Sequence, residues 1–216
     1  MEEARHRVAS AASRLAADGL VHGSAGNVSE RLDDLVAVTA TGAEFATLTA
    51  DQVVVVDLHG DPVEGDLLPT SELALHLGIY RRYDAGAVVH THAPFSTAVS
   101  CALEGELPVV HYQLLALGGP VRIAAYATFG TTELADATLK ALEGRAAALM
   151  ANHGAIAYGP SLDAALANSA LLEWGCMLYW RAAAIGSPRA LTAHQQQEFI
   201  ETVARRGYGV THVREQ

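Results

Sequence analysis

The sequence predicts an α/β protein, a three-layer α/β/α sandwich around a mixed, largely antiparallel sheet. Segments with the two-residue alternation of strands take turns along the chain with segments that have helical periodicity. Half of the 216 residues are hydrophobic, which is enough to bury a large core without disulfides. No glycine-rich nucleotide-binding motif of the GxGxxG or GxxxxGK[ST] type follows a predicted strand. We therefore expect one domain that covers residues 1–216.

The first half of the chain alternates helical and extended patterns. The expected elements are a helix over 3–18, a strand over 35–39, a strand in the run 51–62 that enters a turn at 60–62, a helix over 69–83 and a strand over 86–90. Thr70 or Ser71 is the expected cap of the second helix, because a hydroxyl there can accept a hydrogen bond from the first turn. Two small-residue turns, GSAGN at 23–27 and TATG at 39–42, separate the early elements.

The second half of the chain continues the alternation. The expected elements are helices over 93–103, 131–144, 161–186 and 192–207, an extended segment over 107–113, and strand-like segments over 147–159. Thr131 or Thr132 is the expected cap of the helix that ends near Gly144. An Asn-His-Gly sequence interrupts the strand-like segment at 152–154.

Charge and composition exclude several classes of protein. The formal net charge is −10, which argues against nucleic acid because the phosphate backbone rewards basic surfaces. The apolar run 164–185 contains Asn168, Glu173 and Arg181, so it predicts a buried helix and not a membrane span. The amino terminus lacks the apolar core of an export signal, and two cysteines are poor material for a disulfide framework. We expect a cytoplasmic protein without membrane partners.

An apolar strand ends in two histidines in the stretch VVHTHAPFSTA, residues 88–98. Side chains alternate between the faces of a strand, so His90 and His92 point the same way and could share one metal ion. A histidine on a strand is more often a hydrogen-bonded core or surface residue. A catalytic zinc site usually needs a third protein ligand and keeps one open position. His153, in the Asn-His-Gly interruption, is the candidate, although that sequence is also ordinary turn chemistry.

Seven motifs in a fixed order extend this prediction over nearly the whole chain. They are GSAGN, TATG, PTSE, VVHTH, VVHYQ, YATFGT and NHG, which begin at residues 23, 39, 69, 88, 109, 126 and 152. This ordered set resembles the class II aldolase and adducin-head family, most closely its L-fuculose-1-phosphate aldolase branch. The resemblance implies the class II aldolase fold and a homotetramer whose active sites lie between subunits.

The resemblance also implies the metal ligands and the catalytic residues. In the family, a His-x-His pair and a later histidine bind zinc, and these map onto His90, His92 and His153. The motif glutamate maps onto Glu72, which would ligate zinc in the empty site and move protons once substrate displaces it. From the residues alone, Glu72 is a favourable carboxylate at a helix amino end. Tyr112 resembles a tyrosine that a neighbouring subunit delivers to the aldehyde half of the substrate; from the residues alone it is a core aromatic.

Three small-residue segments match the phosphate-binding positions of the family. Backbone N–H groups in glycine-rich turns and hydroxyls at a helix amino end can converge on an anion. The matching residues are Gly26, Asn27, Thr41, Gly42, Thr70 and Ser71, with Thr70 in place of a serine that the family has. Tyr208, in the carboxy-terminal tail, resembles a mobile tyrosine that closes over substrate.

The implied reaction is the zinc-dependent cleavage of a ketose 1-phosphate, such as L-fuculose 1-phosphate. The products would be dihydroxyacetone phosphate and a small aldehyde, L-lactaldehyde in that example, through a zinc-stabilised enediolate. Zinc or another divalent transition metal suits the chemistry, because neutral imidazoles leave the ion its full double charge as a Lewis acid.

Other functions use related residues. Within the family the same zinc site also serves 5-deoxyribulose-phosphate aldolases, 4-epimerases, dehydratases and decarboxylases, although the segment typical of the epimerases is missing here. A non-catalytic adducin-like interaction domain would have no reason to keep the ligand set. A zinc hydrolase would need a further aspartate-bearing motif, which HTHAPF does not provide.

Overall fold

A single mixed sheet organises the molecule. The computed structural model describes residues 1–206, and in this part of the chain a nine-stranded sheet has the order β4-β3-β2-β1-β5-β9-β8-β7-β6. Neighbouring strands pair antiparallel except β7 and β8, which are parallel. The strands are β1 Gly26–Leu32, β2 Leu35–Thr39, β3 Val53–Asp57, β4 Pro62–Glu64, β5 Ala87–Thr91, β6 Glu106–Leu107, β7 Val121–Ala124, β8 Ala147–Met150 and β9 Gly154–Gly159.

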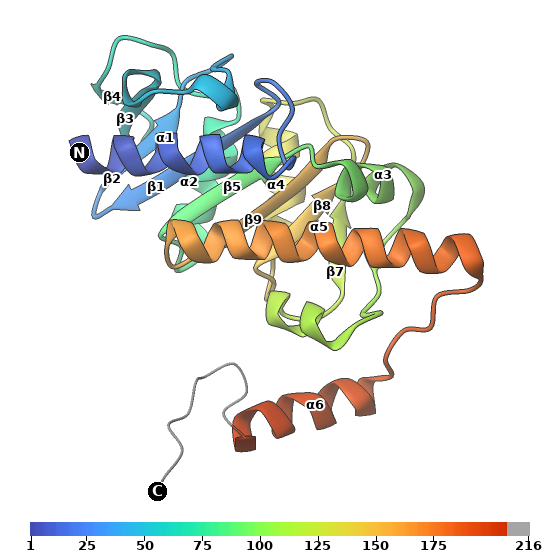
Figure 1. Cartoon of the computed structure of the whole chain (residues 1–216). Coiled ribbons are helices and arrows are strands. Elements are labelled where there is room, and N and C mark those ends of the chain that lie inside the picture. The colour runs from blue at the N-terminus through green and yellow to red at the C-terminus, as the bar shows by residue number, and fades with distance from the viewer. Residues whose placement is uncertain (207–216) are drawn as a thin grey trace, which may run out of the picture.

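Helices cover both faces of the sheet (Figure 1). One buried cluster joins α1 and the start of α5 to β1, β2, β3 and β5, and a second joins α3 and α5 to β8 and β9. A third cluster joins α2 and α4 to the opposite face. The helices are α1 Glu2–Ala17, α2 Leu73–Arg82, α3 Pro94–Ala102, α4 Thr132–Ala141, α5 Leu162–Ile185 and α6 Ala193–Arg206. The predicted three-layer α/β/α sandwich with a mixed, largely antiparallel sheet is confirmed.

The valine-rich strands show why both faces are buried. In β3 the side chain of Val53 packs into the cluster beneath α1, whereas Val54 and Val56 pack into the cluster beneath α2. These alternating contacts follow from the two-residue period of a strand. A strand that is covered on both sides reads as a continuous apolar run, as VVVV does here.

The long helix α5 is fixed at its start and tied to α3. The Ser161 hydroxyl caps α5 by accepting a hydrogen bond from Ala164 N at 3.3 Å. The Glu173 carboxylate accepts hydrogen bonds from the free backbone N–H groups of Phe95 and Ser96 at the start of α3, at 2.8 and 2.7 Å. Among the residues that the structure describes, no helix combines the length and the apolar character needed to cross a membrane.

Several element boundaries differ from the sequence-based prediction. Strand β1 begins at Gly26, inside the predicted glycine turn, because Gly26 already pairs with Thr91 of β5. Helix α2 begins at Leu73 with Glu72 as its N-cap, and the Thr70 hydroxyl accepts a hydrogen bond from Glu72 N at 3.3 Å just before it. The segment 107–113 is extended only at its start, and the 3₁₀ helix η3 Tyr112–Leu117 follows.

The centre of the sheet brings distant segments to one edge. Strand β5 pairs antiparallel with β1 on one side and with β9 on the other. The carboxyl end of β5 therefore lies beside the amino ends of both neighbours, with Thr91 opposite Gly26 and Ala155. The predicted phosphate turn, the histidine pair and the Asn-His-Gly turn meet there for this reason.

Candidate metal centre and active site

Two histidines project from the end of the central strand β5. His90 lies inside the strand, between Asn27 of β1 and Ile156 of β9, and only 1% of its surface is exposed. His92 follows the last strand residue, Thr91, and is partly buried. The expected alternation places the two imidazoles on the same side, with His90 Nε2 and His92 Nε2 3.0 Å apart.

The third histidine comes from the tight turn between β8 and β9. Asn152 adopts the left-handed conformation with φ 54°, which asparagine tolerates better than most residues. His153 N donates to Met150 O at 3.1 Å and closes the turn. Because β9 pairs with β5, this turn holds His153 next to the end of the histidine-bearing strand.

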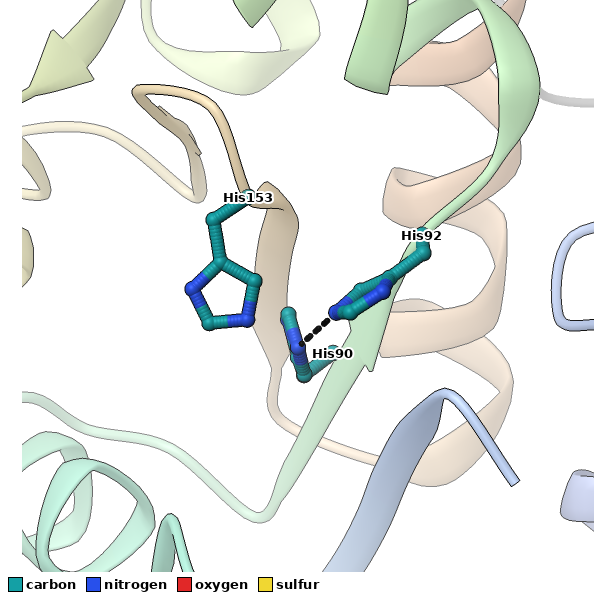
Figure 2. A group of neighbouring side chains, drawn as sticks. All are labelled: His90, His92 and His153. Atoms are coloured by element: carbon teal, nitrogen blue, oxygen red, sulfur yellow. Dashed lines mark hydrogen bonds between the residues drawn. The ribbon is translucent and has the colours of Figure 1, made fainter. Parts of the chain in front are cut away.

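The three imidazoles converge on one point (Figure 2). The ring centroids lie 4.9 Å apart in every pair, and one nitrogen from each ring lies within 4.8 Å of the other two. The rings stand nearly perpendicular to one another, with interplanar angles of 72°, 80° and 82°. The structure thus brings together His90, His92 and His153, which the sequence places up to 63 positions apart.

A hydrogen bond of His90 to the backbone fixes which ring nitrogen faces His92. His90 Nδ1 lies 2.9 Å from Ala155 O, and a carbonyl oxygen can only accept, so the nitrogen donates. In the neutral ring this leaves Nε2 without a proton and facing His92. A backbone carbonyl that fixes the tautomer in this way is the usual support of a metal-binding histidine.

Glu72 completes the cluster from the start of helix α2. Its side chain is 6% exposed, and Oε2 lies 3.1 Å from His90 Nε2 while Oε1 lies 3.6 Å from His153 Nε2. Oε1 is buried and has no hydrogen-bond partner within the described part of the chain. Burial alone would raise the pKa of this carboxyl, but the nearby His90, the hydrogen bond from Asn27 and the nearby His153 outweigh it and lower the pKa. The carboxyl is therefore ionised at neutral pH.

The cluster fits a divalent transition metal. Burial, followed by His90 and His153, lowers the pKa of His92 to about 4, and burial also lowers the pKa of His153. Both rings are thus neutral at pH 7, which is the form that ligates a metal. Two nitrogens on one tetrahedral zinc lie about 3.3 Å apart, close to the 3.0 Å between His90 and His92. A cation would also satisfy the unpaired Glu72 Oε1.

A cavity of about 310 Å³ opens over the cluster. His92, His153 and Glu72 lie on its wall. The predicted phosphate-binding residues line it too: Gly26, Asn27, Thr41, Gly42, Thr70 and Ser71. Tyr126 and Phe129, which are 65% and 66% exposed, add aromatic rings to the lining. Metal ligands, hydroxyls and small-residue turns therefore share one space of the size of a small molecule.

Asn27 differs from the other predicted phosphate residues. Its side-chain amide donates to Glu72 Oε2 at 2.9 Å, and its carbonyl oxygen lies 2.5 Å from His76 Nε2. The side chain is only 5% exposed. Asn27 therefore holds the Glu72 carboxylate through a hydrogen bond, whereas Thr41, Thr70 and Ser71 are hydroxyl-bearing residues of the cavity lining.

Within one chain, Tyr112 does not lie in the cavity of the histidines. Tyr112 begins η3 and lines a second cavity with Phe199, whose ring centroid is 4.7 Å from that of Tyr112. This second cavity lies between η3, α5 and α6, where α6 leaves the sandwich (Figure 1). Tyr208 lies outside the described residues.

The polar side chains that connect to Glu72 through Asn27 were not among the predicted site residues. His76 and Tyr80 are buried, with 0% and 2% of their surface exposed, and neither was a predicted site residue. The available signal was the spacing of Glu72, His76 and Tyr80, because residues four apart lie on one helix face. Ser29, two residues after Asn27 on a strand, gave the matching signal on the other side.

Gly154 allows the close approach of β9 and β5, so alanine at this position is expected to disturb the metal centre. A Cβ atom there would press against Thr91 O and lie 2.9 Å from His92 Cδ2. We expect Gly154→Ala to lower the free energy of unfolding by about 1–3 kcal/mol, as overpacking does, and to weaken zinc binding. Thermal unfolding and zinc titration measure both effects. Gly186→Ala, where a Cβ meets nothing within 4 Å, is the control that should change neither; unchanged zinc affinity in Gly154→Ala would contradict the expectation.

The fold and the site together define a metal-dependent enzyme architecture, and comparison with known proteins agrees. The model of the class II aldolase and adducin N-terminal domain matches residues 6–180. The chain is similar to a Rhodospirillum rubrum 5-methylthioribulose-1-phosphate/5-deoxyribulose-1-phosphate aldolase, with 42% identity over 91% of this chain and 89% of that protein. It is also 42% identical to an Escherichia coli L-fuculose phosphate aldolase, over 79% of each chain.

A solved structure supports the same assignment. The structure of an L-fuculose 1-phosphate aldolase superposes with a TM-score of 0.89 at 34% identity, over 94% of this chain and 97% of that one. The chain therefore belongs to the class II aldolase and adducin family. The family resemblance and the fold that the sequence predicted are both confirmed.

Proposed function

We propose that this protein is a zinc-dependent aldolase that cleaves a ketose 1-phosphate into dihydroxyacetone phosphate and a small aldehyde. The observation that carries the proposal is the cluster of His90, His92 and His153 with Glu72. Of these, His92, His153 and Glu72 lie in the wall of a cavity that the small-residue turns also line. Metal ligands and anion-binding segments in one cavity suit a phosphorylated sugar that must also place a carbonyl and a hydroxyl at the metal. We propose that residues 1–216 act as one domain.

Each requirement of the cleavage has a residue that can meet it. A zinc ion held by three neutral imidazoles supplies Lewis-acid stabilisation of the charge that C–C cleavage leaves on the ketose half. Glu72 is ionised, and one of its oxygens has no hydrogen bond. It can therefore take and return a proton at the carbon of the ketose half where the bond breaks. Hydroxyls of Thr41, Thr70 and Ser71 can donate to the phosphate, which matters in a chain whose net charge is −10.

The three candidate substrates are 5-methylthioribulose, 5-deoxyribulose and L-fuculose 1-phosphates. They share the phosphate half, so the aldehyde half distinguishes them. The relative named for 5-methylthioribulose and 5-deoxyribulose 1-phosphates aligns over more of this chain than the one named for L-fuculose phosphate, at equal identity. Cleavage of 5-deoxyribulose 1-phosphate would release acetaldehyde, and L-fuculose 1-phosphate would release L-lactaldehyde. We place the five-carbon substrates first and L-fuculose 1-phosphate, which the sequence motifs favoured, second.

A substrate panel tests the proposal. The purified zinc-loaded protein is incubated with 5-deoxyribulose, 5-methylthioribulose and L-fuculose 1-phosphates, and dihydroxyacetone phosphate is measured with a coupled dehydrogenase. We expect release from at least one substrate, and loss of that release after chelation and its return with zinc. Absence of release from every ketose 1-phosphate would refute the proposed function. Full activity after verified removal of the metal would refute the metal-dependent mechanism.

Tyr112 is proposed to complete the site of a neighbouring subunit in a homotetramer. Within one chain it lines a separate cavity, and its family counterpart acts across a subunit interface. Tyr112→Phe is expected to lower kcat by about 100-fold, the lower end of a positioned acid's contribution, and to leave zinc affinity unchanged. Steady-state kinetics and zinc titration on the same preparation check this.

A matched substitution controls for the loss of a tyrosine hydroxyl. Tyr179→Phe removes a hydroxyl from α5 outside the site and should leave kcat unchanged. A wild-type kcat in Tyr112→Phe would remove this tyrosine from the mechanism. For this comparison, both variants must sediment as oligomers of the same size as the wild type.

A further inference from the structure

A chain of five buried polar side chains runs from the metal centre into the core. It alternates between helix α2 and strand β1 in the order Glu72, Asn27, His76, Ser29, Tyr80. The successive distances are 2.9 Å from Asn27 Nδ2 to Glu72 Oε2, 2.5 Å from His76 Nε2 to Asn27 Oδ1, 2.7 Å from Ser29 Oγ to His76 Nδ1, and 2.7 Å from Tyr80 OH to Ser29 Oγ. None of the five side chains is more than 6% exposed.

Helix and strand periodicity produce this arrangement. Glu72, His76 and Tyr80 are four residues apart and lie one above the other on α2, whereas Asn27 and Ser29 point to the same face of β1. The strand residues fit between the helix residues, so each polar group faces the next. Every member is polar in an otherwise apolar layer, which only a fully connected chain makes energetically acceptable.

The hydrogen bonds that join these five side chains have only one possible donor-to-acceptor direction. The Asn27 amide nitrogen donates to Glu72 Oε2, so the oxygen of the same amide faces His76 Nε2 and must accept from it. Complete burial lowers the pKa of His76 to about 3, so the ring is neutral at pH 7 and its proton sits on Nε2. His76 Nδ1 then accepts from the Ser29 hydroxyl, which in turn accepts from Tyr80 OH.

At the Glu72 end of this row of polar side chains, the two carboxylate oxygens have different surroundings. Oε2 is held by Asn27, while Oε1 remains buried and without a hydrogen bond on the side of His153. If the row of side chains served only to satisfy the hydrogen bonds of the buried histidine, it would not need to extend to a carboxylate of the metal centre. The arrangement instead fixes the rotation of the carboxylate and keeps one oxygen available.

We propose that His76 is a positioning residue for Glu72, acting through Asn27 and held in its tautomer by Ser29 and Tyr80. Its role is to set the orientation of the Asn27 amide, because only the observed orientation presents an N–H to Glu72. The proposal deepens the proposed function and rests on it in one respect, namely that Glu72 works at the metal.

A double-mutant cycle on zinc affinity tests whether His76 acts through Glu72. Zinc binding is measured by competition with a chromophoric chelator for the wild type, His76→Leu, Glu72→Gln and the double variant. We expect His76→Leu to weaken zinc binding by about 10- to 100-fold, as loss of an indirect support of a metal ligand does. In the Glu72→Gln background the same substitution should have almost no further effect. An equal loss in both backgrounds would overturn the proposal.

Conservative and matched variants separate positioning from simple stability. His76→Gln keeps a side-chain N–H that can reach Asn27, so it should restore most of the zinc affinity that His76→Leu loses; failure of this rescue would count against the role. Tyr80→Phe and Tyr83→Phe each remove one tyrosine hydroxyl near the end of α2. The Tyr83 hydroxyl donates to Leu139 O and is not part of the row of five polar side chains. Only Tyr80→Phe should weaken zinc binding, and equal affinities would overturn the part assigned to Tyr80.

The zinc measurements need no sugar phosphate. If the wild type cleaved no ketose 1-phosphate, the proposed function would fail while the cycle would still report on His76. With an active wild type, His76→Leu should lower kcat at saturating zinc and leave KM nearly unchanged, because the phosphate-binding turns are untouched. A change confined to KM would contradict a role through Glu72.

Discussion

His92→Ala is expected to abolish zinc binding and with it almost all aldolase activity. His92 supplies one of three nitrogens that lie within 4.8 Å of each other, and two histidines with a partly engaged carboxylate are a weak site for zinc. Loss of the Lewis acid removes roughly 4 kcal/mol of transition-state stabilisation, which corresponds to a fall of about 1,000-fold in kcat. Zinc content by mass spectrometry and release of dihydroxyacetone phosphate are measured on the same gel-filtered protein.

His92 is the best of the three ligands for this test. His90 is 1% exposed and hydrogen-bonded to Ala155, so its truncation would also leave a cavity and an unpaired carbonyl in the core. His92 lies beyond the strand end and is only partly buried, so the fold should survive. The control is His59→Ala, an exposed histidine in a turn, which should keep zinc and activity. A His92→Ala protein with a full complement of zinc would contradict the assigned ligand.

The sequence was sufficient for the parts of the site that depend on local periodicity. The two-residue alternation of β5 placed His90 and His92 on one side, and the structure shows their Nε2 atoms 3.0 Å apart. That His153 joins them depends on β9 pairing with β5, a long-range contact that no local pattern reports. The Asn-His-Gly interruption made His153 only one candidate among several histidines, and the resemblance of seven ordered motifs to a known family supported the choice.

The prediction was least complete where tertiary contacts decide the structure. Strand β4 lies at one outer edge of the sheet, and the strands β7 and β6 lie at the other. All three are short, so their sequences show little periodicity. Tyr112 was expected in an extended segment, but the chain turns into η3 once Leu107 has paired with β7. The buried chain through His76 was missed because its signal is divided between a helix and a distant strand, and neither half is unusual alone.

Glu72→Gln is expected to lower kcat by about 100- to 10,000-fold, the range that a positioned acid or base contributes. Glutamine has nearly the same shape, and its amide oxygen can accept the hydrogen bond from Asn27 as Oε2 does now. The amide nitrogen then faces His153 in place of Oε1, where it can neither take a proton nor ligate a metal. Zinc should bind more weakly but still saturate, since three imidazoles remain, so kcat is measured at saturating zinc.

The matched control is Glu173→Gln, which changes a second carboxylate whose two oxygens are fully used by Phe95 and Ser96 N–H groups away from the cavity. It should cost stability through weaker hydrogen bonds at the start of α3 and leave kcat near the wild-type value. Comparable losses of kcat in both variants would mean that the effect of Glu72→Gln comes from the fold. Wild-type kcat in Glu72→Gln at saturating zinc would assign the proton transfer to another group. Only a selective loss in Glu72→Gln supports the view that the unpaired Oε1 is kept for the reaction.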